Sequence, residues 1–146
     1  MSDVLAQLID MSRYLGDPDK PYAILGEGNT SARVDDDSFY VKASGTTLGT
    51  ITEAGFVRVR ISQVLGLLDD PGAGDEDVAQ ALRDARVDPE ETRMPSVETM
   101  LHAALLQYPE YQFIGHTHPE ATNGLLCSKV AEEAVGGRLC PDHVVV

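Results

Sequence analysis

The chain has 146 residues, a formal net charge of −13 and 42% hydrophobic residues, which together predict one soluble domain, residues 1–146, with its own apolar core. The excess of 24 acidic over 11 basic residues argues against binding to nucleic acid or to anionic membrane surfaces, and no apolar run is long enough to span a membrane. Two cysteines, Cys127 and Cys140, are too few for a disulfide framework, so reduced packing thiols and a cytoplasmic localisation are expected.

The first elements predicted are a helix and a hairpin. Apolar residues recur at helical spacing over 3–15, and Gly16 and Pro18 follow where a helix would stop. Two short runs, 30–34 and 39–43, flank an acidic turn and are typical of paired antiparallel strands.

The middle of the chain continues with one strand and two short helices. Residues 56–61, FVRVRI, alternate apolar and basic side chains as a half-buried strand does. Ser62 is expected to cap a short helix that runs to Leu68. A weak helix is predicted over 76–86, and 87–94 is expected to be an exposed connection.

The clearest helix is predicted over 97–107, with Ser96 as its N-cap. Its core-facing side is expected to be apolar and to consist of Val97, Met100, Leu101, Ala104 and Leu105.

The remaining elements follow a histidine-rich strand. Residues 112–118 are predicted as this strand, since His118 precedes Pro119 and is biased toward extended backbone. Pro119 suits the start of another helix to about Cys127, and residues 144–146 resemble the start of a further strand. No internal repeat is present, which favours a single domain.

The histidine pair is the first candidate for chemistry. Because side chains on a strand alternate with period two, His116 and His118 lie on the same side and can approach one ion. Imidazole suits Zn²⁺ or another divalent metal. The alternative is two hydrogen-bonded histidines near the end of a strand.

Glu98 and His102 lie one helical turn apart, on the same face of the predicted helix. A carboxylate beside a metal-bound carbonyl can move a proton from the neighbouring carbon. Alternatively, Glu98 is an acid at a helix start that the helix dipole favours. His102 is expected to orient its neighbours or to pack in the core, not to bind a metal.

Three clusters of small polar residues could hold an anion through backbone N–H groups and hydroxyls. The residues concerned are Gly28, Asn29, Ser44, Gly45 and Ser96. None of the clusters matches a P-loop, and each taken alone is also typical of a turn or a helix cap.

Taken together, four blocks resemble in order and spacing the signatures of the class II aldolase/adducin family, which includes the fuculose- and rhamnulose-phosphate aldolases. The resemblance runs from about residue 5 to the C-terminus. Its blocks are Gly28-Asn29-Thr30-Ser31, Ser44-Gly45, Pro95-Ser96-Val97-Glu98 with His102, and His116-Thr117-His118-Pro119.

The resemblance implies an α/β fold: three α/β/α layers around a largely antiparallel sheet, here C-terminally incomplete, and usually a tetramer with active sites at subunit interfaces. It also implies a zinc site with His116 and His118 as two of three histidine ligands, and Glu98 as the catalytic acid/base close to the metal. The phosphate of a sugar would be held by the anion-binding residues named above.

Two departures from the family pattern affect these expectations. Family members often carry two serines before the glutamate, whereas this chain has Ser96 and Val97, so one hydroxyl is absent from the phosphate site. The third histidine ligand of the family is expected beyond Val146. His143 is too close to the histidine strand to be its counterpart, and is either a substitute ligand or a loop histidine.

The expected function is that of a zinc-dependent aldolase-type lyase, which cleaves or forms a C–C bond in a small phosphorylated sugar through a metal-stabilised enediolate. One alternative is a non-catalytic, adducin-like interaction module or an inactive fragment. A second alternative is a dehydratase, epimerase or decarboxylase of the same family. The expected partners are a small phosphorylated sugar and, in a possible homotetramer, other copies of the chain.

Overall fold

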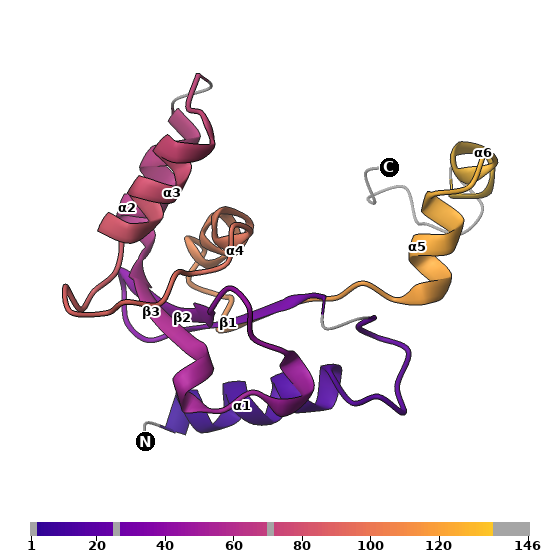
Figure 1. Ribbon diagram of the computed structural model, residues 1–146, viewed down its shortest axis with the longest axis horizontal. Coiled ribbons are helices and arrows are strands. Elements are labelled where there is room, and N and C mark those ends of the chain that lie inside the picture. The colour runs from indigo at the N-terminus through magenta and orange to yellow at the C-terminus, as the bar shows by residue number, and fades with distance from the viewer. Residues whose placement is uncertain (1–2, 25–26, 70–71, 136–146) are drawn as a thin grey trace.

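The computed structural model describes residues 3–24, 27–69 and 72–135, and its centre is an antiparallel sheet (Figure 1). The strands of this sheet are β1 (Asn29–Arg33), β2 (Ser38–Lys42), β3 (Phe56–Arg60) and β4 (Phe113–His116). Their spatial order is β3-β2-β1-β4, and every neighbouring pair is antiparallel. The predicted hairpin is β1 and β2, which the acidic turn joins.

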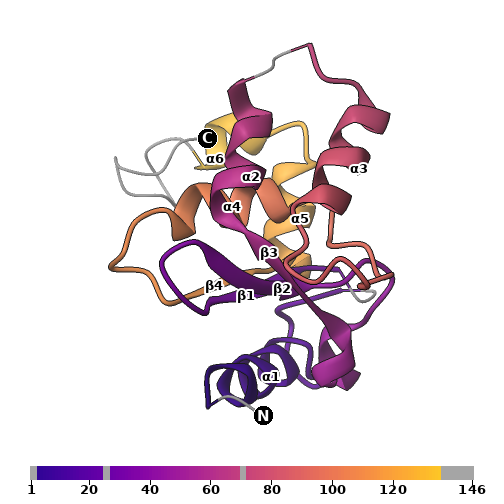
Figure 2. The same cartoon turned by 90° about the vertical axis from the view of Figure 1, so that its left-hand side faces the viewer.

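Helices cover both faces of the sheet. They are α1 (Asp3–Leu15), α2 (Ile61–Leu65), α3 (Asp75–Asp84), α4 (Thr99–Leu106), α5 (Glu120–Leu126) and α6 (Ala131–Val135), with 3₁₀ turns η1 (Leu48–Thr50), η2 (Glu53–Gly55) and η3 (Gly66–Asp69). Helix α1 lies against one face, and α2, α3 and α4 lie on the other (Figures 1 and 2). The predicted three-layer α/β/α arrangement around an antiparallel sheet is therefore confirmed.

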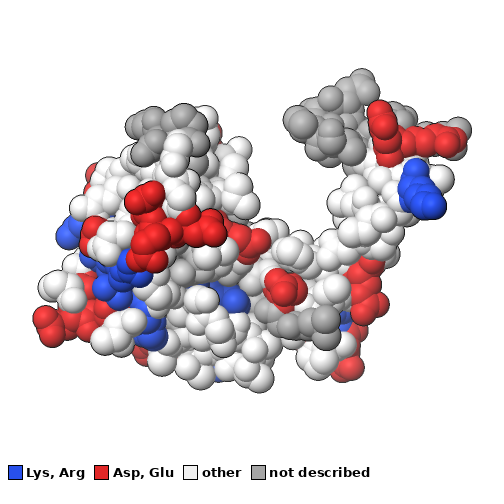
Figure 3. Space-filling view, turned by 45° about the horizontal axis from the view of Figure 1, so that its top comes forward, with Lys and Arg blue, Asp and Glu red and all other residues white. Residues whose placement is uncertain are grey.

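Helices α5 and α6 form an arm that extends away from the three layers (Figure 1). Helix α5 has no buried residue. In the space-filling view a hollow separates this arm from the body, and acidic side chains outnumber basic ones on the face shown (Figure 3). Among the described residues, no helix combines the length and the apolar character needed to cross a membrane.

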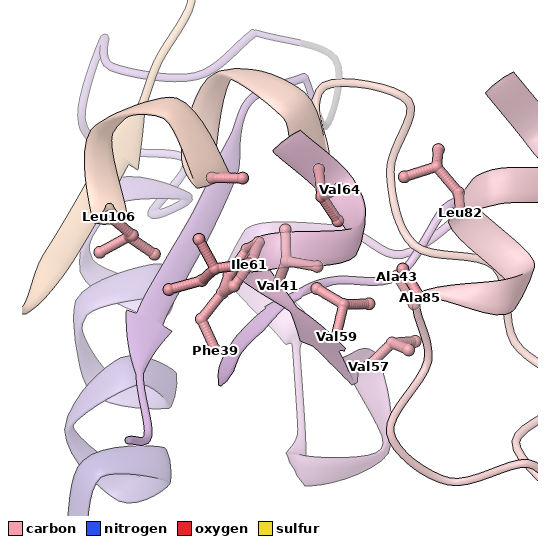
Figure 4. Packing of buried hydrophobic residues seen from close by; sticks show 11 residues of the cluster. Phe39, Val41, Ala43, Val57, Val59, Ile61, Val64, Leu82, Ala85 and Leu106 are labelled. Carbon is pink, nitrogen blue, oxygen red and sulfur yellow. The ribbon is translucent and has the colours of Figure 1, made fainter. Parts of the chain in front are cut away.

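Two apolar cores flank the sheet. The larger core lies between the sheet and α2, α3 and α4 (Figure 4), and its buried members are Phe39, Val41, Ala43, Val57, Val59, Ile61, Val64, Leu82, Ala85, Ala103 and Leu106. The smaller core lies against α1 and contains Leu5, Leu8, Ile9, Ala32, Ile51 and Phe56. The period-two alternation of β2 and β3 supplies apolar residues to both cores.

Strand β1 is central and buried although its sequence, NTSAR, is mostly polar. On the face toward α1, Thr30 Oγ1 lies 2.6 Å from Ser12 Oγ, whose own hydroxyl donates to the carbonyl of Leu8 at 2.6 Å. On the face toward α4, Ser31 Oγ lies 2.7 Å from His102 Nδ1. Because a buried polar group is costly unless it is hydrogen-bonded, these partners explain how a polar strand occupies the middle of the molecule.

Most of the predicted core-facing side of the helix over 97–107 is wrong, although Met100 packs against the larger core as predicted. Val97, Leu101 and Leu105 are 70%, 59% and 45% exposed, whereas His102 is 1% exposed. Helix α4 also begins at Thr99 rather than residue 97. The helix is apolar on most of its surface, and hydrogen bonds to residues distant in sequence decide which side is buried.

Some smaller predictions also fail. Ser62 does not cap α2, since the N-cap is Arg60; the Ser62 hydroxyl and N–H instead bind the carboxylate of Asp37, at 2.9 and 2.8 Å. Strand β4 ends at His116, two residues earlier than predicted. Cys127 is a free thiol that is exposed instead of packed.

The predictions for Cys140, for His143 and for a strand at 144–146 lie outside the described residues.

Candidate metal centre and adjoining cavity

The pairing of β1 with β4 places the first part of the site. Asn29 lies directly opposite His116 in the antiparallel register, so both side chains project from the same face of the sheet. Gly28, just before β1, has a φ of 93°, and a Cβ at this position would lie 2.7 Å from the carbonyl oxygen of His116. The close approach of the two backbones therefore requires glycine at residue 28.

Glu98, His116 and His118 form a group that could hold a metal ion, since one ligand atom from each lies within 4.8 Å of the others. The Glu98 carboxylate lies 3.5 Å from His116 Nδ1 and 4.0 Å from His118 Nε2. These two imidazole nitrogens are buried and have no hydrogen-bond partner among the described residues. Two such nitrogens beside a carboxylate fit a divalent cation.

The carboxylate of Glu98 is fixed by a contact with β1. It occupies the N-cap position of α4, where its backbone N–H points to Ser96 Oγ at 3.3 Å. Its carboxylate oxygen Oε2 accepts a hydrogen bond from Nδ2 of Asn29. The carboxylate is therefore oriented by β1 as well as by its own helix.

His102 lies beneath this group and is not part of it. Its ring centroid is 6.5 Å from that of His116, and its Nε2 is buried with no hydrogen-bond partner among the described residues. Burial, and secondarily the charge of His116, lower the pKa of His102 to about 4. The ring is therefore neutral near pH 7.

A cavity of about 400 Å³ adjoins the carboxylate of Glu98. Its lining brings together every residue that the sequence suggested for an anion, namely Gly28, Asn29, Ser44, Gly45 and Ser96. Gly45 has a φ of 77°, a conformation that favours glycine. The remaining lining residues are Glu27, Lys42, Thr46, Thr47 and Val97.

Backbone pairing brings the two serines of this cavity together. The N–H of Ser96 donates to the carbonyl of Lys42 at 3.1 Å, and the N–H of Ser44 donates to that of Met94 at 2.8 Å. The segment before α4 therefore runs antiparallel to the end of β2. Residues separated by some fifty positions in the sequence thus share one wall of the cavity.

Lys42 is a lining residue that sequence reasoning missed. Its side chain is buried, and burial lowers its pKa, while the carboxylates of Glu98 and Glu27 act in the opposite direction. The sequence did contain a signal for this role, because Lys42 stands at the end of a buried strand, two residues before the Ser44-Gly45 turn.

These features define the class of protein as a mixed α/β/α domain with a possible metal centre next to a polar cavity. A family model described as the Class II Aldolase and Adducin N-terminal domain matches residues 6–142. The chain belongs to this family.

Solved structures agree with the family. The N-terminal class II aldolase domain of a conserved protein from Thermoplasma acidophilum matches with a TM-score of 0.74 and 33% identity, over 90% of this chain and 62% of that one. YgbL from Klebsiella pneumoniae matches with a TM-score of 0.59 and 19% identity, over 86% of this chain and 49% of that one, which supports the fold alone.

Two curated relatives are longer than this chain. The uncharacterized oxidoreductase YuxG of Bacillus subtilis is 29% identical, over 90% of this chain and 20% of that protein. The methylthioribulose-1-phosphate dehydratase of Microcystis aeruginosa is 35% identical over 97 residues, which are 66% of this chain and 38% of that protein. The chain thus spans between a fifth and two fifths of the lengths of these relatives.

Proposed function

We propose that this protein is a zinc-dependent lyase that cleaves or forms a C–C bond in a small phosphorylated sugar. The observation that carries the proposal is the position of the Glu98, His116 and His118 group at the rim of a cavity lined by anion-type residues. The metal group and the cavity share Glu98. A substrate could therefore place its phosphate in the cavity and its reacting carbon near the carboxylate.

His116, His118 and Glu98 are the residues that would hold the metal. Two histidines with one glutamate are a known set of protein ligands for catalytic zinc, which leaves a position for substrate. The third histidine expected from the family resemblance stays a prediction. A divalent cation would supply stabilisation of the negative charge that develops on the substrate oxygens as the C–C bond breaks.

Glu98 is the residue proposed to move the proton. Its carboxylate is half-buried, lines the cavity and is oriented by the amide of Asn29. In the cleavage direction it would accept the proton of the substrate hydroxyl whose carbon becomes a carbonyl. In the synthetic direction the same carboxyl would return that proton.

The anion site is proposed to combine one buried cation with neutral donors. Lys42 would provide the charge, while Ser44, Gly45 and Ser96 would provide hydroxyls and backbone N–H groups. Asn29 would hold Glu98 through its Nδ2, while its Oδ1, which is buried without a partner among the described residues, would be free to accept a hydrogen bond from a substrate hydroxyl. Val97 stands where a second serine is frequent in the family, so the phosphate would have one hydroxyl fewer.

A dehydratase of the same family is the second candidate. It is favoured by the 35% identity to a methylthioribulose-1-phosphate dehydratase. Loss of water next to a carbonyl begins with removal of a proton from carbon, so the same cation and the same carboxylate would serve it. A non-catalytic interaction module is less well supported, because it has no use for two imidazole nitrogens that lie beside a carboxylate and have no partner within the described part of the chain.

The test is turnover by the zinc-loaded protein on a panel of ketose phosphates, with products of C–C cleavage and of dehydration both measured. We expect cleavage, its loss on chelation, and a fall in kcat of about 10²–10⁴-fold in Glu98→Gln, compared at equal measured zinc content, because this substitution keeps the shape of the side chain but removes the base. Dehydration without cleavage would favour the second candidate. Unchanged turnover after chelation or in Glu98→Gln would contradict both.

A further inference from the structure

Two side-chain contacts join β1 to the start of α4. Asn29 and Ser31 are two residues apart on the strand, while Glu98 and His102 are four residues apart at the start of the helix. Asn29 contacts Glu98, and Ser31 Oγ lies 2.7 Å from His102 Nδ1. The periods of strand and helix thus bring two pairs into register along one interface.

The contact between Ser31 and His102 is unusual for its buried, largely apolar surroundings. Ser31 is 0% exposed and His102 is 1% exposed, and they adjoin the larger core, in which α4 contributes Ala103 and Leu106. Burying an imidazole costs free energy, and the hydrogen bond to Ser31 offsets part of that cost. Two apolar side chains would fill the same space without it. The contact therefore adds specificity of position more than it adds stability.

The contact between Asn29 and Glu98 depends on the position of α4 on β1. Glu98 is the N-cap of α4 and lies at the start of the helix, where no intrahelical bond holds its own N–H. Rotation of α4 by one residue would turn the carboxylate by about 100° around the helix axis and away from the histidines. The contact of His102 with Ser31, one turn further along the helix, opposes this rotation.

We propose that the hydrogen bond between Ser31 and His102 is a positioning contact, which fixes the rotation of α4 on β1 so that Asn29 reaches Glu98 and the carboxylate faces His116 and His118. This inference rests on the metal centre of the proposed function. Ser31 and His102 are positioning residues and do not bind metal themselves.

A matched control exists on the same strand. Thr30 makes an equivalent buried hydroxyl contact, 2.6 Å from Ser12 Oγ, but on the opposite face and away from the site. Ser31→Ala and Thr30→Val therefore each remove one buried hydroxyl contact from β1. Only the first removal acts on α4.

The experiment measures zinc affinity by competition with a chromophoric chelator, and stability by urea unfolding, on the same samples. We expect Ser31→Ala and His102→Gln to weaken zinc binding by about 10–100-fold, the range typical of residues that orient metal ligands. His102→Asn, whose amide lies near the position of Nδ1, should retain most of the affinity. Thr30→Val should move the urea midpoint but not the affinity.

A second readout does not need the metal. In ¹⁵N spectra of the metal-free protein, the side-chain amide of Asn29 reports its contact with Glu98, and it should shift in Ser31→Ala but not in Thr30→Val. Equal effects of the two substitutions on both readouts, or no effect of Ser31→Ala on either, would overturn the positioning role. A wild-type protein that binds no zinc would contradict the proposed metal centre, and the Asn29 signal would still decide this inference.

Discussion

At the scale of single residues, Lys42 is the only basic side chain that lines the described cavity, and it shares that cavity with the carboxylates of Glu27 and Glu98. An anion that enters therefore meets one favourable charge and two unfavourable ones. The affinity for phosphate should depend strongly on the lysine, because a hydrogen bond to a charged group contributes about 1.5–3 kcal/mol.

Lys42→Met keeps the aliphatic length of the side chain and removes its charge. We expect inorganic phosphate to bind at least about tenfold more weakly to this variant, as follows from the loss of one charged hydrogen bond. Lys129→Met, which changes an exposed lysine of the chain, is the control for net charge. Equal phosphate binding by the two variants in calorimetric titration would place the anion elsewhere.

His102 gives a pH dependence of known sign. Burial lowers its pKa to about 4 in the folded protein, from the ordinary histidine value of 6.5. Between these values the unfolded chain binds a proton that the folded chain does not, so the free energy of unfolding falls as the pH falls through this window. From pH 7 to pH 4 this one group accounts for about 3 kcal/mol.

The measurement is urea unfolding of the metal-free protein at several pH values, compared with His102→Asn. The asparagine variant cannot titrate, so we expect its free energy of unfolding to decline less steeply between pH 6.5 and 4. Parallel pH profiles for the two proteins would show that the buried imidazole does not stay neutral on acidification.

At the scale of elements, the approach of β1 to β4 depends on the backbone at Gly28. An alanine there meets both an unfavourable positive φ, which costs about 1–2 kcal/mol, and the carbonyl oxygen of His116 at 2.7 Å. We expect Gly28→Ala to lower the free energy of unfolding by about 2 kcal/mol or more and to weaken zinc binding.

Gly66→Ala is the control for this substitution. A Cβ at Gly66 meets no atom within 4 Å, and its φ is −56°, so alanine is expected to be neutral or slightly stabilising. Urea midpoints that fall equally in both variants would mean that the backbone at residue 28 adapts to a side chain.

The sequence predicted the elements better than it predicted their faces. The helix over 3–15 coincides with α1, and the alternation of FVRVRI indicated β3, because both signals are local periodicities. Helix α4 has no clear apolar face, and the side that it buries is decided by the contact of His102 with Ser31, which lies far away in the sequence. No periodicity within the helix contains that information.

In the candidate site, too, the sequence predicted the features that depend on local pattern and missed those that depend on tertiary pairing. His116 and His118 lie together, as the period of extended backbone predicts, although β4 ends at His116, and turn-forming residues were enough to indicate the cavity. Lys42 was missed because its role depends on the segment before α4, which pairs with the end of β2. The contact of Asn29 with Glu98 and its position opposite His116 likewise depend on tertiary pairing, which the sequence alone does not determine.

At the scale of the whole molecule, the described surface leaves exposed apolar side chains at Leu101 and Leu105 on α4 and at Val97 just before it, and an arm formed by α5 and α6. The homotetramer expected from the family resemblance stays a prediction. Sedimentation velocity tests it directly, because the assembly would have four times the 15.7 kDa mass of the chain. A single species at the mass of the chain would contradict it.

The central claim is that Glu98, His116 and His118 hold one divalent metal ion. Its most direct test is a zinc titration of the protein and of variants that each lack one histidine, with bound metal measured by elemental analysis. We predict one zinc per chain, loss of that zinc in His116→Ala and in His118→Ala, and retention in His143→Ala. Binding that persists without His116 and His118, or a wild-type protein that binds no zinc, would contradict the account.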